Sequence, residues 1–280
     1  MTIKVYRTVQ SIRDAVDGFK RNGQTTALVP TMGGLHAGHL SLVKIAKETA
    51  DTAIASVFVN PKQFNNADDL RNYPRDEMDD FGKLEKAGID AIYAPDETEM
   101  YPTGFATNVA VDASSNILCD AHRPGHFDGV ATVVSKLFLQ TGADYAVFGE
   151  KDFQQLFIIR KLVNDLNIPI QIVPAKTIRE TDGLAMSSRN LNLDKEARKK
   201  APELFKAMNE TAEAIRNSAG IQKTCADAIN GLQDKYGFKV EYFEVRMEAD
   251  LELADVYEGQ LRLFAAAWLG GVRLIDNLEI

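Results

Sequence analysis

Cysteine, histidine and long apolar runs are scarce in this chain of 280 residues, which has two cysteines, four histidines and one tryptophan. Cys119 and Cys225 are too few and too far apart in sequence to predict a disulfide framework or a zinc site, which is typical of a reducing cytoplasm. No run approaches the roughly 18 apolar residues that indicate a membrane span, and the first residues contain no apolar signal core. We therefore predict a soluble, cytoplasmic protein with no membrane partner.

Positive charge is also in short supply. Lysine and arginine number 32 against 40 aspartates and glutamates, so the formal net charge is −8. Broad binding to nucleic acid needs a basic face that neutralises phosphates, and we therefore predict no nucleic-acid partner. The composition, 45% hydrophobic and 26% charged, is typical of a globular enzyme, and the length suffices for one large or two moderate domains.

Strand and helix patterns alternate as far as about residue 176. Strands are predicted at Ala27–Pro30, Thr52–Val59, Ala91–Ala94, Tyr145–Gly149 and Ile170–Pro174, and helices at about 9–21, 40–50, 76–87, 129–141 and 153–166. Continuously apolar strands between amphipathic helices indicate strands buried on both faces, and hence a Rossmann-like parallel sheet of the α/β class. Ligands bind such sheets beyond the carboxyl ends of the strands.

The pattern changes after residue 176. A loop is predicted at 177–192 and helices at about 194–218 and 222–235, followed by strands Lys239–Arg246, Leu261–Leu269 and Val272–Ile275, with Gly270-Gly271 as the last turn. We therefore predict two domains. Residues 1–176 form the nucleotide-binding α/β domain, residues 177–280 form a smaller α+β domain with an antiparallel sheet, and the boundary lies near 176–184.

A glycine-rich turn with two histidines follows the first predicted strand. Residues 30–39 read Pro-Thr-Met-Gly-Gly-Leu-His-Ala-Gly-His. The glycines let a bulky anion approach the backbone, and His36 and His39 fall on one face of a first helical turn, beside its unpaired N–H groups. This pattern predicts a nucleotide-phosphate site. A histidine pair at this spacing also occurs in metal sites and on ordinary surfaces, but the few histidines and isolated cysteines disfavour a metal.

Three other segments place polar side chains at strand ends or in a loop. Lys151 follows the strand predicted at 145–149 and is suited to a phosphate or a carboxylate, although a solvated charged turn would look the same. Ser187-Ser188-Arg189 has the composition of a triphosphate clamp and equally that of an ordinary loop. Asn60 and Gln63 are amides that could orient a small polar substrate, or could simply line a proline turn.

Two weaker signals remain. Arg123 and His126 precede an apolar helix, and the arginine could face a carboxylate or phosphate. Asp79 and Asp80 offer a carboxylate pair for a magnesium ion bound to nucleotide, but a solvated helix face is the favoured interpretation of this pair.

Six segments together resemble the pantothenate synthetase (pantoate–β-alanine ligase) family. They are PTMGGLHAGHLSLV, FVNPKQF, YPRD, RPGHFDGV, FGEKDFQQ and MSSRN, in the family's order and over nearly the whole chain. The family belongs to the nucleotidyltransferase-like α/β superfamily that includes class I aminoacyl-tRNA synthetases. Gly34 stands where the family commonly has alanine, Phe153 replaces a frequent tyrosine, and the position of Lys62 is variable in the family. None of these differences threatens the chemistry.

The resemblance implies an ATP-dependent condensation of (R)-pantoate with β-alanine to pantothenate, through a pantoyl adenylate, with release of AMP and pyrophosphate. It also implies magnesium as the Mg–ATP complex and a homodimer formed through the N-terminal domain. Rival hypotheses are a nucleotidyltransferase that makes a dinucleotide and a non-catalytic RNA-binding relative. The first leaves the FVNPKQF amides and Gln155 unexplained, and the acidic charge and intact Lys151 and His39 count against the second.

The resemblance further implies roles for individual residues. His39, as proton donor, and Lys151, at the α-phosphate, would be catalytic. Gln63 and Gln155 would orient pantoate, and Asn60 and Gln63 would receive β-alanine. The implied ATP-binding residues are Met32, Gly33, Gly34, Leu35, His36, Ala37, Gly38, His39, Gly149, Glu150, Lys151, Asp152, Ile178, Met186, Ser187, Ser188 and Arg189.

Overall fold

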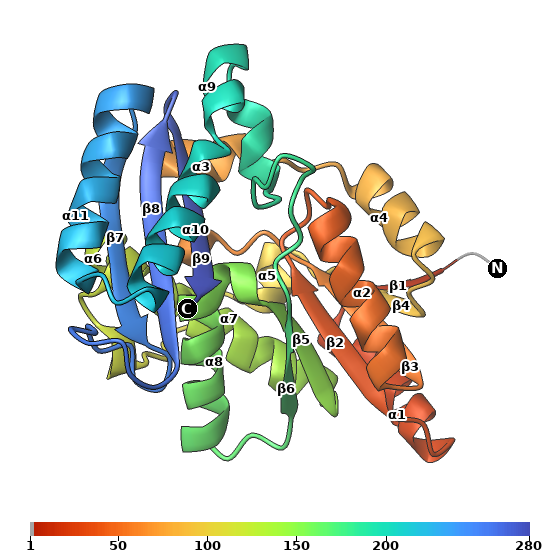
Figure 1. The fold of residues 1–280 in the computed structure, drawn as a ribbon. Coiled ribbons are helices and arrows are strands. Elements are labelled where there is room, and N and C mark those ends of the chain that lie inside the picture. The colour runs from red at the N-terminus through yellow and green to blue at the C-terminus, as the bar shows by residue number, and fades with distance from the viewer. Residues whose placement is uncertain (1–2) are drawn as a thin grey trace. The chain divides into compact units, whose positions relative to one another are not determined.

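The computed structural model describes residues 3–280 and divides into two compact units (Figure 1). The first unit runs to Glu150 and also includes Gln154–Lys176. The second unit comprises Lys151–Phe153 and Thr177–Ile280. The short segment Lys151–Phe153 therefore groups with the C-terminal part of the chain, although the sequence on both sides of it belongs to the first unit.

The first unit is built on a six-stranded sheet in the order β1-β4-β3-β2-β5-β6. Every neighbouring pair is parallel, which confirms the α/β class predicted from the apolar strands. The strands are β1 (Lys4–Tyr6), β2 (Thr26–Thr31), β3 (Thr52–Val57), β4 (Ala91–Tyr93), β5 (Tyr145–Gly149) and β6 (Gln171–Ala175). The strand order reverses between β2 and β5, and ligands of open α/β sheets bind beyond the strand ends at such a point.

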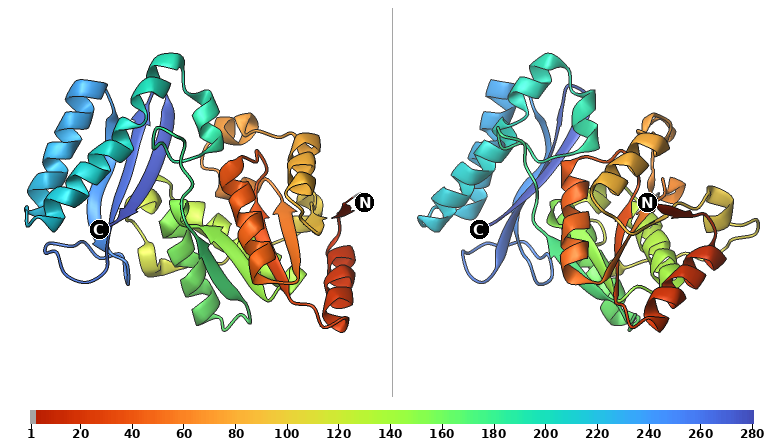
Figure 2. Two further views of the ribbon diagram at one scale, coloured as in Figure 1. Left: turned by 45° about the vertical axis from the view of Figure 1, so that its right-hand side comes forward. Right: turned by 90° about the vertical axis from the view of Figure 1, so that its right-hand side faces the viewer.

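Helices cover both faces of this sheet. Figure 2 shows α1 (Val9–Arg21) and α2 (Ala37–Thr49) on opposite faces. Helix α7 (His126–Thr141) packs beside α1, while α2 crosses β2, β3 and β5 with α4 (Glu77–Lys86) next to it. The remaining elements of this part of the chain are α3 (Ala67–Asn72), α5 (Glu97–Met100), α6 (Leu118–His122), α8 (Phe153–Asp165) and the short 3₁₀ turns η1 (Pro61–Gln63), η2 (Asp112–Ser114) and η3 (Glu150–Asp152).

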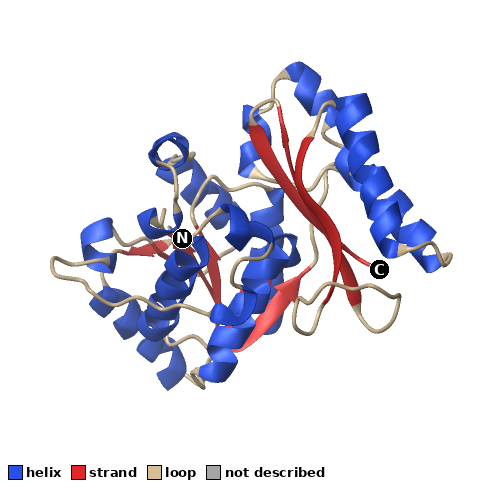
Figure 3. Cartoon of the chain, turned by 90° about the vertical axis from the view of Figure 1, so that its left-hand side faces the viewer, coloured by secondary structure: helices blue, strands red, loops and turns tan. Residues whose placement is uncertain are grey.

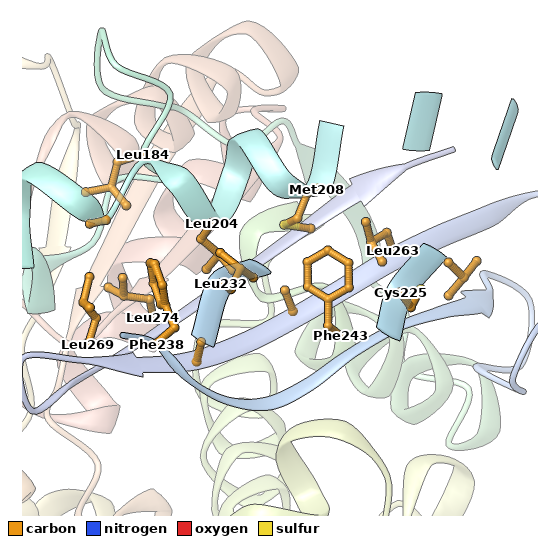
Figure 4. Close-up of a cluster of buried hydrophobic side chains, with 14 of the residues drawn as sticks. Leu184, Leu204, Met208, Cys225, Leu232, Phe238, Phe243, Leu263, Leu269 and Leu274 are labelled. Carbon is orange, nitrogen blue, oxygen red and sulfur yellow. The ribbon is translucent and has the colours of Figure 1, made fainter. Parts of the chain in front are cut away.

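The second unit is an antiparallel sheet in the order β7-β8-β9 with helices on one face (Figure 3). Its elements are η4 (Ser188–Asn192), α9 (Lys195–Lys200), α10 (Glu203–Arg216), α11 (Ile221–Gly231), a π turn η5 (Leu232–Tyr236), β7 (Lys239–Met247), β8 (Leu261–Leu269) and β9 (Val272–Glu279). Figure 4 shows its core, where Leu204 and Met208 of α10 meet Phe243 and Leu263 of the sheet. Burial of these apolar side chains is the main favourable term in folding this unit.

Several predicted elements differ from the structure at their ends. The helix predicted at 194–218 is two helices, because Pro202 cannot donate to the backbone of the preceding turn. The helix predicted at 40–50 begins at Ala37, and the one predicted at 129–141 begins at His126. Strand β9 continues to Glu279 rather than ending at Ile275.

Some short elements gave no clear signal in the sequence, among them β1, α3, α5 and α6. Each is six residues or shorter, which is too short for an apolar period to repeat. Within residues 3–280, no helix combines the length and the hydropathy that crossing a bilayer requires.

Candidate active site

A buried carboxylate holds the glycine-rich turn after β2. Asp80 of α4 is 2% exposed, and its two oxygens accept the backbone N–H groups of Gly34 (2.9 Å) and Leu35 (2.8 Å). Gly33 and Gly34 have φ of +80° and +62°, a region that glycine enters without a steric penalty. A Cβ on Gly33 would also lie 2.8 Å from Asp80 Oδ2. The turn therefore requires both glycine and the carboxylate that bridges it.

The two histidines use the ring nitrogen nearer the backbone to cap α2. His36 is the N-cap residue, and its Nδ1 accepts the N–H of Gly38 at 3.1 Å. His39 Nδ1 accepts the N–H of His36 at 3.4 Å, and the two ring centroids are 4.1 Å apart. Because a backbone N–H can only donate, each neutral ring must carry its proton on Nε2. The start of α2 thus carries two Nε2–H donors at the positive end of a helix dipole, an arrangement suited to an anion.

The acidic pair predicted for magnesium makes other contacts. Both oxygens of Asp80 accept backbone hydrogen bonds, while Asp79 forms an ion pair with Lys83 at 2.6 Å. No cluster of three or more potential metal-binding side chains is found anywhere in residues 3–280. The magnesium role of Asp79 and Asp80 stays a prediction, and these contacts favour a structural role for Asp80.

Asn60 uses its whole hydrogen-bonding capacity within the protein. It caps η1 just beyond β3 and is 1% exposed. Its Oδ1 accepts the N–H of Lys62 (3.3 Å) and the hydroxyl of Tyr101 (2.7 Å). Its Nδ2 donates to Gln63 Oε1 and to the carbonyl of Gly129, both at 3.0 Å. An asparagine amide has two donor and two acceptor positions, so all four are occupied.

Helix α7 presses directly against this turn. His126 Nδ1 donates to the carbonyl of Gln63 at 2.7 Å. A Cβ on Gly129 would lie 2.4 Å from the carbonyl oxygen of Lys62, closer than any side chain could stand. Neither Tyr101 nor Gly129 was among the predicted site residues. A glycine inside an apolar helix was the available signal for Gly129, because it indicates a close backbone approach.

Lys151 is anchored through its backbone to the sheet of the second unit. Asn277 of β9 donates from Nδ2 to the carbonyl of Lys151 at 2.9 Å. Two residues on, the Phe153 ring packs edge-on against Phe264, and the Arg262 guanidinium lies 4.0 Å from its centroid. The Lys151 ammonium is 3.7 Å from the Asp152 carboxylate. These contacts explain why Lys151–Phe153 groups with the C-terminal strands.

Asp276, which precedes Asn277 in β9, holds the start of the predicted loop at 177–192, which contains the residues predicted to clamp phosphates. Asp276 pairs with both terminal nitrogens of Arg179, whose guanidinium also stacks 3.5 Å from the Phe205 centroid. Further along, Ser187 caps η4 by accepting the N–H of Arg189 at 3.3 Å. The predicted loop at 177–192 is thus tied at its start by a bidentate ion pair and ends in a short 3₁₀ turn.

The structure distributes the predicted residues between the two units. The first holds Met32, Gly33, Gly34, Leu35, His36, Ala37, Gly38, His39, Asn60, Gln63, Gly149, Glu150 and Gln155. The second holds Lys151, Asp152, Ile178, Met186, Ser187, Ser188 and Arg189. Residues predicted to bind ATP therefore occur in both units.

The model of one protein family, described as pantoate-beta-alanine ligase, matches residues 4–279. The chain belongs to this family. It is 53% identical over 280 residues to the pantothenate synthetase of Roseobacter denitrificans, covering all of this chain and 99% of that protein. These matches confirm the family resemblance and the ligase activity predicted from the six segments.

Solved structures agree with the same assignment. The pantothenate synthetase of Thermus thermophilus superposes with a TM-score of 0.93 at 40% identity, over 99% of both chains. The pantoate-beta-alanine ligase of Francisella tularensis, complexed with beta-gamma ATP and beta-alanine, gives a TM-score of 0.78 at 32% identity, over 99% of this chain and 97% of that one. The α/β fold class is confirmed by these relatives as well as by the strand order.

Replacing Gly129 by alanine should push η1 away from α7, because the new Cβ would overlap the Lys62 carbonyl. We expect ligase activity to fall at least about tenfold and the free energy of unfolding to drop by about 1–3 kcal/mol, as for other overpacked sites. Steady-state kinetics and urea denaturation measure the two effects.

Gly82→Ala is the matched control, since Gly82 also lies inside a helix but has open space where its Cβ would stand. Alanine there should leave activity unchanged and stabilise the protein by up to about 1 kcal/mol through helix propensity. If Gly129→Ala and Gly82→Ala changed ligase activity and the free energy of unfolding equally, the close approach of Gly129 to the Lys62 carbonyl would not matter for either property.

Proposed function

We propose that this ligase condenses (R)-pantoate with β-alanine in two half-reactions through a pantoyl adenylate. The observation that carries the proposal is the capped start of α2, where His36 and His39 offer two Nε2–H donors, in a chain that matches the pantoate-beta-alanine ligase family over residues 4–279. An unactivated carboxylate resists attack by an amine, so the acid must first be joined to AMP.

In the first half-reaction, a carboxylate oxygen of pantoate attacks the α-phosphorus of ATP and pyrophosphate leaves. Negative charge grows on the α-phosphate and pyrophosphate oxygens, so catalysis consists of positioning and electrostatic stabilisation. We assign the phosphates to Met32–His39. Because the Nδ1 contact of His39 leaves its ring neutral, His39 acts in this proposal by donating a hydrogen bond from Nε2–H to a phosphate oxygen, in place of the proton transfer that the family resemblance implied. Lys151 supplies a positive charge to the α-phosphate through the transition state.

The remaining ATP contacts follow the family motifs. Gly149 and Asp152 hold the ribose, and the Ile178 backbone meets the adenine. Met186–Arg189 closes on the β- and γ-phosphates, where the arginine can bind two oxygens at once. The capped η4 turn supports this assignment, because it fixes the backbone that carries Ser188 and Arg189.

In the second half-reaction, the amine of β-alanine attacks the acyl carbon and AMP leaves. Gln63 and Gln155 orient pantoate, and Gln63 receives β-alanine. A direct contact from Asn60 to β-alanine would require one of its four existing hydrogen bonds to break. The ligase of Francisella tularensis has been solved with beta-alanine bound, which supports β-alanine as a substrate of this family.

We assign magnesium to the Mg–ATP complex rather than to a site on the protein. The carboxylate of Asp80 already accepts two backbone hydrogen bonds, and that of Asp79 already pairs with Lys83. We also propose a homodimer formed through the N-terminal domain and a location in the cytoplasm, where ATP is available. Light scattering coupled to size-exclusion chromatography decides between one and two chains.

The activity is tested by ATP–pyrophosphate exchange with a panel of carboxylic acids and phosphorylated acceptors. We expect exchange that requires pantoate and proceeds without β-alanine. Lys151→Ala should slow exchange by roughly 10²–10³ because a charge that stabilises the transition state is lost. Lys161→Ala removes a half-exposed lysine of α8 that pairs with Asp165, and it should leave the rate unchanged.

Exchange driven by a phosphorylated acceptor instead of pantoate would contradict the proposed function. Exchange by the folded Lys151→Ala variant within about threefold of wild type would contradict the assigned role of Lys151 alone.

A further inference from the structure

The orientation of the Asn60 amide is fixed by two backbone groups. The N–H of Lys62 can only donate, so the atom facing it at 3.3 Å must be the oxygen Oδ1. The carbonyl of Gly129 can only accept, so the atom facing it at 3.0 Å must be the nitrogen Nδ2. The assignment of oxygen and nitrogen in this amide therefore follows from chemistry alone.

The Asn60 amide in turn fixes the amide of Gln63. Its second Nδ2 hydrogen points to Gln63 at 3.0 Å, so the facing atom must be the acceptor Oε1. The other end of the Gln63 amide, with its two Nε2 hydrogens, is then directed away from Asn60. Gln63 in this orientation offers donors and is complementary to an oxygen of a ligand rather than to an ammonium group.

Tyr101 makes the fourth hydrogen bond of the Asn60 amide. Its hydroxyl donates to Asn60 Oδ1 at 2.7 Å, a shorter contact than the one from Lys62. The Tyr101 ring packs against the Phe105 ring, with 5.1 Å between the two centroids. The Lys62 ammonium lies 5.2 Å from the centroid of the Tyr101 ring. Burial, reinforced by the charge of Glu97, raises the pKa of the Tyr101 phenol, so the hydroxyl remains a protonated donor at physiological pH.

We propose that Tyr101 is a positioning residue that acts through Asn60 to hold the Gln63 amide with its Nε2–H donors toward an oxygen of the acid substrate. This inference rests on the proposed role of Gln63 in binding pantoate. Without the Tyr101 hydroxyl, Asn60 Oδ1 keeps only the long hydrogen bond from the Lys62 N–H. The two backbone contacts then still favour this orientation of the Asn60 amide but hold it less tightly, and the Gln63 amide that depends on it gains freedom to turn. A turned Gln63 would present its oxygen to another oxygen, which is repulsive.

Tyr101→Phe removes the hydroxyl and keeps the ring. We expect the KM for pantoate to rise roughly tenfold, about the effect of one lost hydrogen bond in a buried network, while the KM for ATP stays within about twofold. Tyr93→Phe is the matched control. The fully buried Tyr93 hydroxyl also donates to a side-chain amide, Gln140 Oε1 at 3.0 Å, so its loss should lower the melting temperature and leave both KM values unchanged.

A double-mutant cycle with Gln63→Ala separates this inference from the proposed function. If Tyr101 acts through Gln63, Tyr101→Phe should cause no further rise in the pantoate KM once the Gln63 amide is absent. Equal effects of Tyr101→Phe in both backgrounds, or no effect in the wild-type background, would overturn the positioning role while leaving Gln63 as a pantoate ligand. A normal pantoate KM in Gln63→Ala would instead overturn the assignment of Gln63 and this inference with it.

Discussion

The carboxylate of Asp80, placed between the N–H groups of Gly34 and Leu35, is the contact on which the candidate site depends. It fixes a turn in which two glycines take left-handed conformations, and that turn delivers His36 to the N-cap of α2. Because His36 and His39 use Nδ1 to cap the helix, their Nε2 atoms carry the protons and can donate to a phosphate. Two neutral imidazoles can thus serve as anion ligands without being protonated to the imidazolium form.

Two other buried polar side chains also form hydrogen bonds to the backbone of a distant segment. Asn60 donates to the backbone carbonyl of Gly129, and Asn277 donates to the backbone carbonyl of Lys151. In each case a polar side chain satisfies backbone groups from a segment far away in sequence, and the residue proposed to meet the substrate belongs to that contact or lies next to it. Buried polar groups are costly unless fully hydrogen-bonded, so these contacts permit few alternative arrangements.

The sequence was sufficient for the features that depend on local pattern. Apolar, β-branched strands predicted the parallel sheet, Gly270-Gly271 predicted the last turn, and six motifs predicted the family. It could not show that Asp80 accepts a hydrogen bond from Gly34, which lies 46 residues earlier in the sequence. In the sequence, a carboxylate early in a helix looks like any solvated acid. Nor could it show that Tyr101 reaches Asn60 or that Lys151 is held by β9. Those contacts exist only after distant elements have packed.

The protonation of the two histidine rings tests this account most directly. Nitrogen-15 NMR of the imidazoles at neutral pH, assigned with His36→Gln and His39→Gln variants, distinguishes a protonated ring nitrogen from an unprotonated one. The account predicts that both rings are neutral, with the proton on Nε2 and an unprotonated Nδ1 that accepts a hydrogen bond. It also predicts that Asp80→Asn, which replaces one acceptor oxygen by a donor, disturbs this state in both rings, whereas Asp79→Asn does not. Protonated Nδ1 atoms in the wild-type protein, or rings indifferent to Asp80→Asn, would contradict it.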